Sequence, residues 1–295
     1  AVVPMIANQQ LTLTEVTRAL VERATVEAVR FDTTDAHRVV PFTPLLLRSE
    51  STASSRIEQL TSSARKVLEA EATGRGRGNA ALIAANTRQM EAAVARARAN
   101  VDGIVEMHQI LLADSAPEIA GVLRGAQVWI GGSDYSPAGA MLVPPHQRHL
   151  TELMADLGEF MARDDLPALA QAAIAHAQFE TIHPFADGNG RTGRALVHVV
   201  LRERGLTTSS ALPLSAGLLT DTAAYFAALD AYRGGDVDRI VQLFARAAID
   251  VAERGSWLAA ELVAVRDEWN EQLTARADAL AWRVLDLLLQ RPVLT

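Results

Sequence analysis

Residues 181–194 read Thr-Ile-His-Pro-Phe-Ala-Asp-Gly-Asn-Gly-Arg-Thr-Gly-Arg, and this stretch decides the fold prediction. Pro184 disfavours helical geometry at the residue before it, so a preceding helix is predicted to end at His183. The glycines that follow permit a tight turn with positive φ. A second helix is predicted to begin at about Arg191 and to end before Gly205, a residue type that often follows a helix. We therefore expect a helix, a glycine-rich loop and a second helix.

The loop is predicted to bind an anion. Backbone N–H groups converge where a glycine-rich turn leads into a helix, and the helix dipole adds about half a positive charge there. On a helical wheel Arg191 and Arg194 share a face with His198 and Arg202, while the opposite face is apolar. Two guanidinium groups beside such a turn suit a di- or triphosphate. The pattern indicates a polyphosphate site.

Two further side chains of this stretch add chemistry. His183 carries an imidazole, the natural acceptor of a proton from an attacking hydroxyl near neutral pH. Asp187 offers one carboxylate, which suffices for Mg²⁺ when phosphate oxygens and water complete the coordination. A base, a metal ligand, a phosphate cradle and two arginines are the parts needed to transfer a phosphorus centre. Taken one at a time, these residues also fit a surface loop with capping side chains and a solvated basic face.

The composition excludes several classes of protein. The 295-residue chain has a formal net charge of −7 and a pI near 5.5, which disfavours non-specific binding of nucleic acid by this portion. It contains no cysteine, so disulfides, thiolate nucleophiles and cysteine-based zinc sites are excluded. No apolar run reaches the roughly 18 residues of a membrane span, and residues 1–7 do not resemble a signal peptide. We expect no membrane association and a cytoplasmic protein.

The fold is predicted to be all-α with one small hairpin. Alanine-rich segments with helical spacing predominate along the chain. The predicted helices are 11–29, 51–71, 79–107, 149–162, 166–181, 191–204, 221–228, 237–252 and 257–289. The hairpin is expected over 127–143, because β-prone residues flank a turn-rich centre and two prolines follow.

The chain is predicted to have three parts. Residues 1–78 form an N-terminal helical region, residues 79–252 the core, and residues 253–295 a set of C-terminal helices. The glycine-rich segment 74–79 is interpreted as a flexible connector, since it lacks the preceding strand and the Lys-Ser/Thr ending of a P-loop.

The motif at 183–194 resembles a known family. It matches, at every defined position, the signature His-Pro-Phe-x-Asp/Glu-Gly-Asn-Gly-Arg-x-x-Arg of the Fic (filamentation induced by cAMP) family. Residues 128–132 and 143–145 resemble the family's flap, a hairpin that holds a target segment by strand-like pairing. Residues 46–50 and 54–58 resemble the N-terminal region of one large Fic group. The resemblance implies the helical Fic fold and a protein adenylyltransferase, which moves AMP from ATP to a protein hydroxyl and releases pyrophosphate.

The resemblance also implies a role for each residue of the motif. His183 would deprotonate a Tyr, Thr or Ser hydroxyl of the target, and Phe185 would be buried and anchor the loop. Asp187 would bind Mg²⁺ at the α- and β-phosphates. Arg191 would hold the β-phosphate and Arg194 the γ-phosphate. The remaining phosphate cradle would consist of Gly188, Asn189 and Gly190, and the flap residues that dock the target would be Trp129, Ile130, Gly131 and Gly132.

A regulatory helix is implied as well. Ser54 and Glu58 fit the family's inhibitory pattern Ser/Thr-x-x-x-Glu-Gly/Asn, except that Gln59 replaces the small last residue. In relatives such a glutamate pairs with the second arginine of the motif, here Arg194. A carboxylate there would deny the γ-phosphate its partner and repel ATP, so Glu58 is expected to suppress activity. The alternative is an ordinary glutamate on a helix surface.

Several alternatives stay open. The same fold could remove AMP, with Glu58 orienting a water, or use another nucleotide donor; from a different class, the chain could be a non-catalytic helical interaction or regulatory module. Self-modification and a homodimer are further expectations. Residues 281–295 resemble the opening helix of a winged-helix module, which implies a truncated chain. Packing roles are expected for His108 and His176, and candidates for the adenine pocket are Tyr225, Tyr232 and Trp257.

Overall fold

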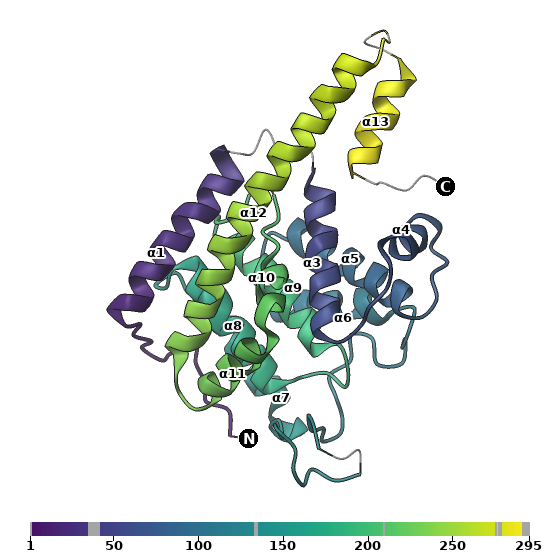
Figure 1. The fold of residues 1–295 in the computed structure, drawn as a ribbon. Helices are drawn as coiled ribbons and strands as arrows, with labels where there is room; N and C mark the ends of the chain where they lie inside the picture. Colours follow the sequence, from purple (N-terminus) through teal and green to yellow (C-terminus); the bar gives the residue numbers. More distant parts are fainter. Residues whose placement is uncertain are drawn as a thin grey trace.

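The computed structural model describes residues 2–34, 42–132, 135–208, 210–274, 276 and 279–290. Helices make up nearly all of the regular secondary structure in these residues, together with two isolated β-bridges. The predicted all-α class is therefore confirmed. The helices surround one large hydrophobic core that draws residues from most of them (Figure 1).

The elements follow one another in this order: α1 (Glu15–Val29), the π-helix η1 (Arg30–Thr34), α3 (Thr43–Ile57), α4 (Ala64–Thr73), α5 (Asn79–Ala95), α6 (Val101–Leu112), the 3-10 helix η3 (Gln147–His149), α7 (Leu150–Met161), α8 (Ala168–Ile182), α9 (Asn189–Glu203), α10 (Leu214–Leu218), the 3-10 helix η4 (Leu219–Asp221), α11 (Thr222–Arg233), α12 (Val237–Gln272) and α13 (Leu280–Gln290).

Helices α8 and α9 form the centre of the molecule. Every residue of α8 from Leu169 to Ile182 is buried, the polar side chains included, so this helix lies inside the molecule on all sides. Helix α9 crosses it closely at Gly193, where an added Cβ would lie 2.9 Å from the Phe179 ring and 2.7 Å from the Glu180 carboxylate. Helices α7, α11 and α12 pack against α8, and α5 and α6 pack against α9. The loop between α8 and α9 is thus held on both sides by a rigid core.

Two predicted helices are each divided in the structure. The helix expected over 51–71 ends at Ile57 in a Schellman motif: Leu60 N–H bonds the Ser55 carbonyl and Gln59 N–H bonds the Arg56 carbonyl. A new helix, α4, then begins after Ser63. The helix expected over 79–107 is also wrong as a single element. It breaks at residues 96–100, where the Asn100 side chain caps α6 by accepting from Gly103 N–H.

Helix α12 joins the helix expected over 237–252 to the first part of the one expected over 257–289, and the rest of the latter is the separate helix α13. Helix α12 continues from Val237 to Gln272 without a break at residues 253–256. Gly255 faces the ring of Phe31. A Cβ added at Gly255 would lie 2.6 Å from this ring, so the glycine allows the two to pack closely. The predicted boundary at residue 252 falls inside this helix, and the division of the chain into three parts stays a prediction.

In place of a longer ladder, the described part of the predicted hairpin has a bridge between Ile130 and Leu142. Ile130 and Leu142 pair through Ile130 N–H to the Leu142 carbonyl and Met141 N–H to the Ile130 carbonyl, both 2.8 Å. Gly131 and Gly132 then take positive φ values of 75° and 79°, which ends strand geometry immediately after the bridge. Residues 133 and 134 of the predicted turn lie outside the described residues.

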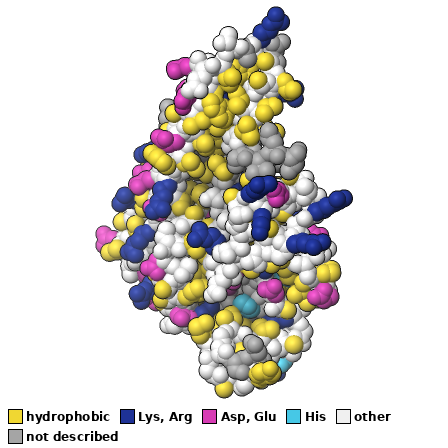
Figure 2. Space-filling model, turned by 45° about the vertical axis from the view of Figure 1, so that its right-hand side comes forward, with side chains coloured by type: hydrophobic (Ala, Val, Ile, Leu, Met, Phe, Trp, Pro, Cys, Tyr) yellow, Lys and Arg dark blue, Asp and Glu magenta, His cyan; other side chains and the backbone are white. Residues whose placement is uncertain are grey.

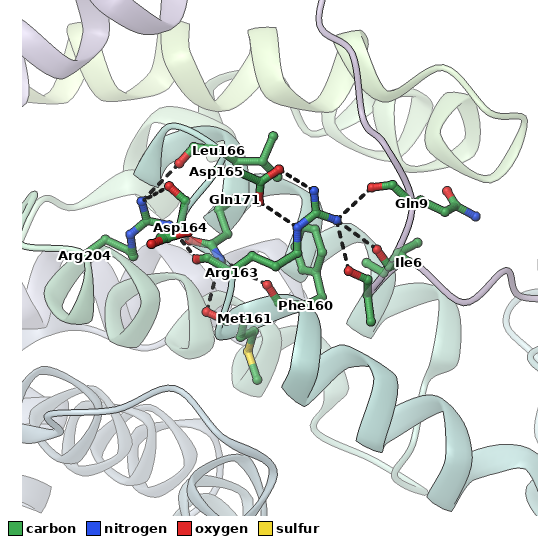
Figure 3. A network of polar contacts seen from close by, with 11 residues as sticks. Ile6, Gln9, Phe160, Met161, Arg163, Asp164, Asp165, Leu166, Gln171 and Arg204 are labelled. Atoms are coloured by element: carbon green, nitrogen blue, oxygen red, sulfur yellow. Dashed lines mark hydrogen bonds and ion pairs between the residues drawn. The ribbon is translucent and has the colours of Figure 1, made fainter.

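Two partly buried arginines fix the loop that leads into α8 (Figure 3). The Arg204 guanidinium, at the end of α9, donates to the carbonyls of Arg163, Asp164 and Leu166. Arg163 in turn reaches the N-terminal segment, where it donates to the carbonyls of residues 6, 7 and 9. These bonds tie the ends of α7, α8 and α9 together and hold the N-terminal segment against them.

The C-terminal helices project from the body. Helix α12 loses its buried residues after Ala259 and extends outward, with α13 folded back beside its end (Figure 1). Hydrophobic side chains gather on this projecting end (Figure 2), and those exposed by more than a third include Trp257, Val265, Leu280 and Leu287. Residues 291–295 of the predicted winged-helix opening lie outside the described residues. None of the described helices is both long and apolar enough to span a membrane.

Candidate active site

His183 ends helix α8 in a left-handed conformation. Its φ and ψ are 50° and 61°, and its N–H still donates to the Phe179 carbonyl at 2.8 Å. The following proline disfavours right-handed helical geometry, as the sequence predicted. Among the described residues only His183 and Gln59 have positive φ without being glycine, and both border the same cavity or its immediate neighbour. Such strained backbone persists where surrounding contacts determine it.

Arg124 supplies those contacts from outside the motif. Its Nε donates to the His183 carbonyl at 2.9 Å, and its backbone N–H donates to the Pro184 carbonyl at 2.9 Å. Its Nη2 reaches the Pro145 carbonyl. This 5 % exposed side chain therefore ties the loop between α8 and α9 to the segment that leads out of the flap. No sequence signal pointed to Arg124, because it is 59 residues away from His183 along the chain.

The rest of the loop is fastened around Phe185, which is fully buried. Its ring stacks on His108 with centroids 3.7 Å apart, and the His108 Nε2 lies 2.9 Å from the Asp187 carbonyl oxygen. The Asn189 side chain both accepts from Phe185 N–H and donates to its carbonyl, each at 2.9 Å. His108, for which only packing was predicted, thus helps to shape the loop. Asn189 can meet a ligand through its backbone, since its side chain is already engaged.

The predicted anion cradle is formed by the start of α9. Gly188 is the N-cap, with a φ of 75°, and the first N–H groups of a helix have no carbonyl partner within it. An added Cβ at Gly190 would lie 2.0 Å from the Glu58 Oε1, so only glycine leaves room there. The Glu58 carboxylate therefore occupies the space directly over the α9 N-terminus, where an anion would bind.

Arg191 presents unused donors at the cavity. It is 4 % exposed, and its buried Nε and Nη1 have no hydrogen-bond partner among the described residues. Its Nη2 lies 3.6 Å from the Asp187 carboxylate. Burial lowers the pKa of its guanidinium from the ordinary value. Unpaired buried donors are costly, so this arrangement fits a site that receives an anion.

Arg194 is, by contrast, fully engaged. Its Nη2 lies 2.8 Å from the Glu58 Oε1 and 2.9 Å from the Ser54 carbonyl, and its Nε donates to the Ser54 hydroxyl at 2.9 Å. The guanidinium is 2 % exposed, whereas the Glu58 side chain is 40 % exposed. The structure thus brings together the three residues that the sequence linked. Tyr225 also interacts with the Arg194 side chain, and its hydroxyl lies 2.8 Å from the His176 Nε2.

One cavity of about 600 Å³ unites these groups. It is lined by His183, Asp187, the start of α9, Arg191, Arg194 and Glu58, and on its other walls by Trp129, Ile130, Gly131, Tyr225, Phe226 and Leu229. Burial lowers the pKa of His183 to about 4, against a raising contribution from the Glu180 backbone. The ring is therefore neutral at pH 7. Of the four predicted flap residues, Gly132 alone does not line this cavity.

The donor set at Asp187 suits one magnesium ion bound with a phosphate. The carboxylate is 65 % exposed on the cavity side of the loop, and one of its oxygens accepts from Gly188 N–H. Among the described residues no group of three or more His, Asp or Glu side chains could hold a metal. A single carboxylate completed by phosphate oxygens and waters is the usual magnesium arrangement at nucleotides.

The geometry agrees with comparisons to known proteins. The pattern of the Fic/DOC family matches residues 98–201. Relatives named protein adenylyltransferase are 30 % identical over 150 residues in Caenorhabditis briggsae and 30 % over 149 residues in Nematostella vectensis, in each case over 50 % of this chain. The matches cover 27 % and 31 % of those relatives, so the chain spans less than a third of their length.

Solved structures resemble the fold over more of the chain. A Fic family protein from Desulfovibrio desulfuricans G20 superposes with a TM-score of 0.71 at 23 % identity, covering 97 % of this chain and 86 % of that one. Fic-1 from Caenorhabditis elegans superposes with a TM-score of 0.63 at 21 % identity, covering 83 % and 73 %. The likeness includes the N-terminal helices, which lie outside the segment matched by the family pattern.

Proposed function

We propose that this chain, whose residues 98–201 match the Fic/DOC family, is a protein adenylyltransferase, which transfers AMP from ATP to a Tyr, Thr or Ser hydroxyl of a target protein. One observation carries the proposal: a neutral imidazole, a helix N-terminus and two buried arginines line a single cavity. The names of the relatives support the same reaction.

The phosphates of ATP bind along the start of α9. The N–H groups of residues 189 and 190 donate hydrogen bonds to phosphate oxygens, and the helix dipole adds to the attraction. Arg191 satisfies its two unpaired donors on the β-phosphate, and Arg194 holds the γ-phosphate once Glu58 has left. Asp187 holds Mg²⁺, which neutralises charge on the phosphates when it is bound.

His183 then acts as the base. Its neutral imidazole accepts the proton of the target hydroxyl, and the oxygen attacks the α-phosphorus. The bond from the α-phosphorus to the bridging oxygen breaks, and pyrophosphate leaves with the electron pair. AMP remains on the target through a new phosphorus–oxygen bond. The engaged backbone of His183 keeps the ring in place during these steps.

The apolar wall of the cavity receives the nucleobase. Phe226 and Leu229 of α11 and Ile130 of the flap line it beside the cradle. Phe226 is 51 % exposed, so its ring is accessible to a base bound in the cavity. The Ile130–Leu142 bridge leaves the flap short, and a strand of the target could pair with it.

Glu58 keeps the enzyme inactive in this arrangement. Its carboxylate sits over the α9 N-terminus and binds Arg194, so it occupies both the anion cradle and the γ-phosphate partner. A bound carboxylate also repels the triphosphate. The half-exposed side chain can turn away without breaking the core, which makes the inhibition reversible.

Labelled ATP tests the proposal. Because Glu58 blocks the site, the Glu58→Gly protein and the double variant that also carries His183→Ala are incubated with Mg²⁺, cell lysate and ATP labelled at either the α- or the γ-phosphate. Protein-bound label is expected from the α position only, and none is expected with His183→Ala, because the base is lost. Label from the γ position would indicate kinase chemistry and contradict the proposal. A Phe226→Leu variant serves as the control for weakened binding of the nucleobase. It alters the apolar wall of the cavity but leaves the His183 imidazole in place.

Removal of AMP is a second candidate reaction, favoured by the position of Glu58. Its carboxylate shares a cavity with His183 and is accessible to solvent, so it could orient a water toward AMP on a modified protein. Incubation of a pre-labelled target with the protein, with and without Glu58→Gly, separates the two reactions. Loss of label only with the intact glutamate supports removal.

A further inference from the structure

Glu180 is a buried carboxylate that the reaction described above does not use. It lies on α8, one turn before His183, and is 7 % exposed. It lines the nucleotide cavity and also a neighbouring cavity of about 390 Å³ between α11, the flap and the end of α3. Its Oε1 is buried and has no hydrogen-bond partner among the described residues. A polar oxygen in such a position is costly unless a ligand or a proton satisfies it.

Charged groups from three helices act on this carboxylate. Burial raises its pKa from 4.5 to about 7; Arg194 of α9 and Arg233 of α11 oppose the rise, and Glu58 of α3 adds to it. The Tyr225 hydroxyl of α11 is also close enough to interact with it, and burial keeps that hydroxyl protonated. Glu180 is thus balanced between its neutral and ionised forms near pH 7.

The histidines nearby are neutral at this pH. Burial lowers the pKa of His176 to about 3, and that of His183 to about 4. An added Cβ at Gly193 would lie 2.7 Å from the Glu180 Oε1 and 3.1 Å from the His176 Nδ1, so these two side chains flank the same turn of α9. The group that changes charge on this side of Arg194 is therefore the carboxylate.

We propose that Glu180 is a nucleotide-binding residue, which takes up one proton from solvent at Oε1 when a terminal phosphate binds Arg194 and then donates a hydrogen bond within the filled site. The inference rests on the proposed function, since it takes ATP as the ligand. Without ATP, the ionised carboxylate shares in balancing the buried Arg194 cation. A phosphate brings more negative charge than Glu58, so Glu180 must become neutral to remain beside it.

Proton uptake by Glu180 should make ATP binding weaker as the pH rises. Below pH 7 Glu180 already carries its proton in the free protein, and binding needs none. As pH rises through 7 the free protein loses the proton, so each binding event must recover it. For a group with a pKa of about 7, the dissociation constant rises roughly tenfold between pH 6 and pH 8. A ligand without the terminal phosphate should show a smaller rise.

Calorimetry with an unreactive analogue tests the proposal. The probe is ATP with a methylene group between the α- and β-phosphorus, in excess Mg²⁺, titrated into the intact chain at pH 6, 7 and 8 in buffers of different ionisation enthalpy. We expect uptake of close to one more proton at pH 8 by the parent than by Glu180→Gln. The dissociation constant should rise about tenfold more in the parent across this range. Titration of the analogue itself is common to both proteins and cancels.

Asp156→Asn is the matched control. Asp156 is another buried carboxylate, but it accepts from Ile6 and Ala7 N–H groups and lines neither cavity. This variant should keep the pH dependence of the parent. Equal proton uptake by the parent and a folded Glu180→Gln protein would overturn the role of Glu180. If neither the parent nor a Glu58→Gly protein binds the analogue at any pH, the proposed function fails; if either binds it tightly and independently of pH, only the inference about Glu180 fails.

Discussion

Glu50 and Glu58 lie about two turns apart on helix α3, and both extend a carboxylate toward α9, yet their surroundings differ. Glu50 is 1 % exposed: it accepts from the Ser215 N–H at 2.7 Å and from the Ser215 hydroxyl, and its Oε1 lies 3.0 Å from the His198 Nε2. Glu58 is 40 % exposed on its side chain and bonds Arg194. The middle of the helix, at Glu50, is enclosed by partners, and its C-terminal end, at Glu58, is open to the cavity.

The difference shows how one helix can be both anchored and releasable. The middle of the helix, at Glu50, can move only by leaving buried donors unpaired, which costs more than a surface contact. The Glu58 end follows the last turn of α3, and its carboxylate can be replaced at Arg194 by a phosphate of the same charge sign. Inhibition then depends on a side chain, while the helix that carries it stays fixed.

Removal of the open-end carboxylate should have the largest effect. Glu58→Gly frees Arg194 and the α9 N-terminus for ATP. Since a hydrogen bond to a charged group is worth about 1.5–3 kcal/mol and each 1.4 kcal/mol is tenfold, we expect AMP transfer to rise roughly ten- to a hundredfold. Transfer of label from α-labelled ATP to lysate proteins and to the chain itself measures it. The double variant with His183→Ala should be inactive, and equal rates for Glu58→Gly and the parent would contradict the inhibitory role.

Substitution of the enclosed carboxylate, Glu50, should lower the stability of the fold more than it changes activity. Glu50→Gln keeps the shape but cannot accept both bonds from Ser215, so a buried donor loses its partner. We expect the free energy of unfolding to fall by about 1–3 kcal/mol, with a gain in AMP transfer much smaller than that of Glu58→Gly. Urea unfolding gives the first quantity. Ser215→Ala, which removes one of the two hydrogen bonds, should lower the free energy of unfolding by less. The contrast between Glu50 and Glu58 is wrong if Glu50→Gln activates AMP transfer as strongly as Glu58→Gly.

The smallest effect is expected at Gln59, next to the open end. It has a φ of 60°, a left-handed value that glycine or asparagine adopts with less strain than glutamine. Gln59→Gly should relieve this strain, stabilise the end of α3 by about 0.5–1 kcal/mol and lower basal AMP transfer about two- to fivefold. Thermal unfolding and the labelling assay report the two changes. Gln59→Asn should lie between, and a rise in activity with glycine would reverse the expectation.

Features set by local sequence were predictable. The end of α8 at His183 followed from Pro184, and the loop and the start of α9 followed from the glycines, because these residues restrict or free their own backbone. The break after Ile57 escaped prediction, since Gln59 is an unusual residue for a left-handed cap and the surrounding residues favour a helix. The hairpin was overestimated for a similar reason: β-prone residues do not make a ladder where the partner strand turns away.

The sequence by itself determined the chemical parts of the site and their order along one loop, because a contiguous motif places its side chains within a few ångströms of one another. Only the tertiary structure decided that Arg124 and His108 hold this loop, that Glu58 lies over the α9 N-terminus, and that Glu180 faces the same arginine. These contacts join residues distant along the chain. Their burial, which sets the charge state of His183 and Glu180, exists only after the helices have packed.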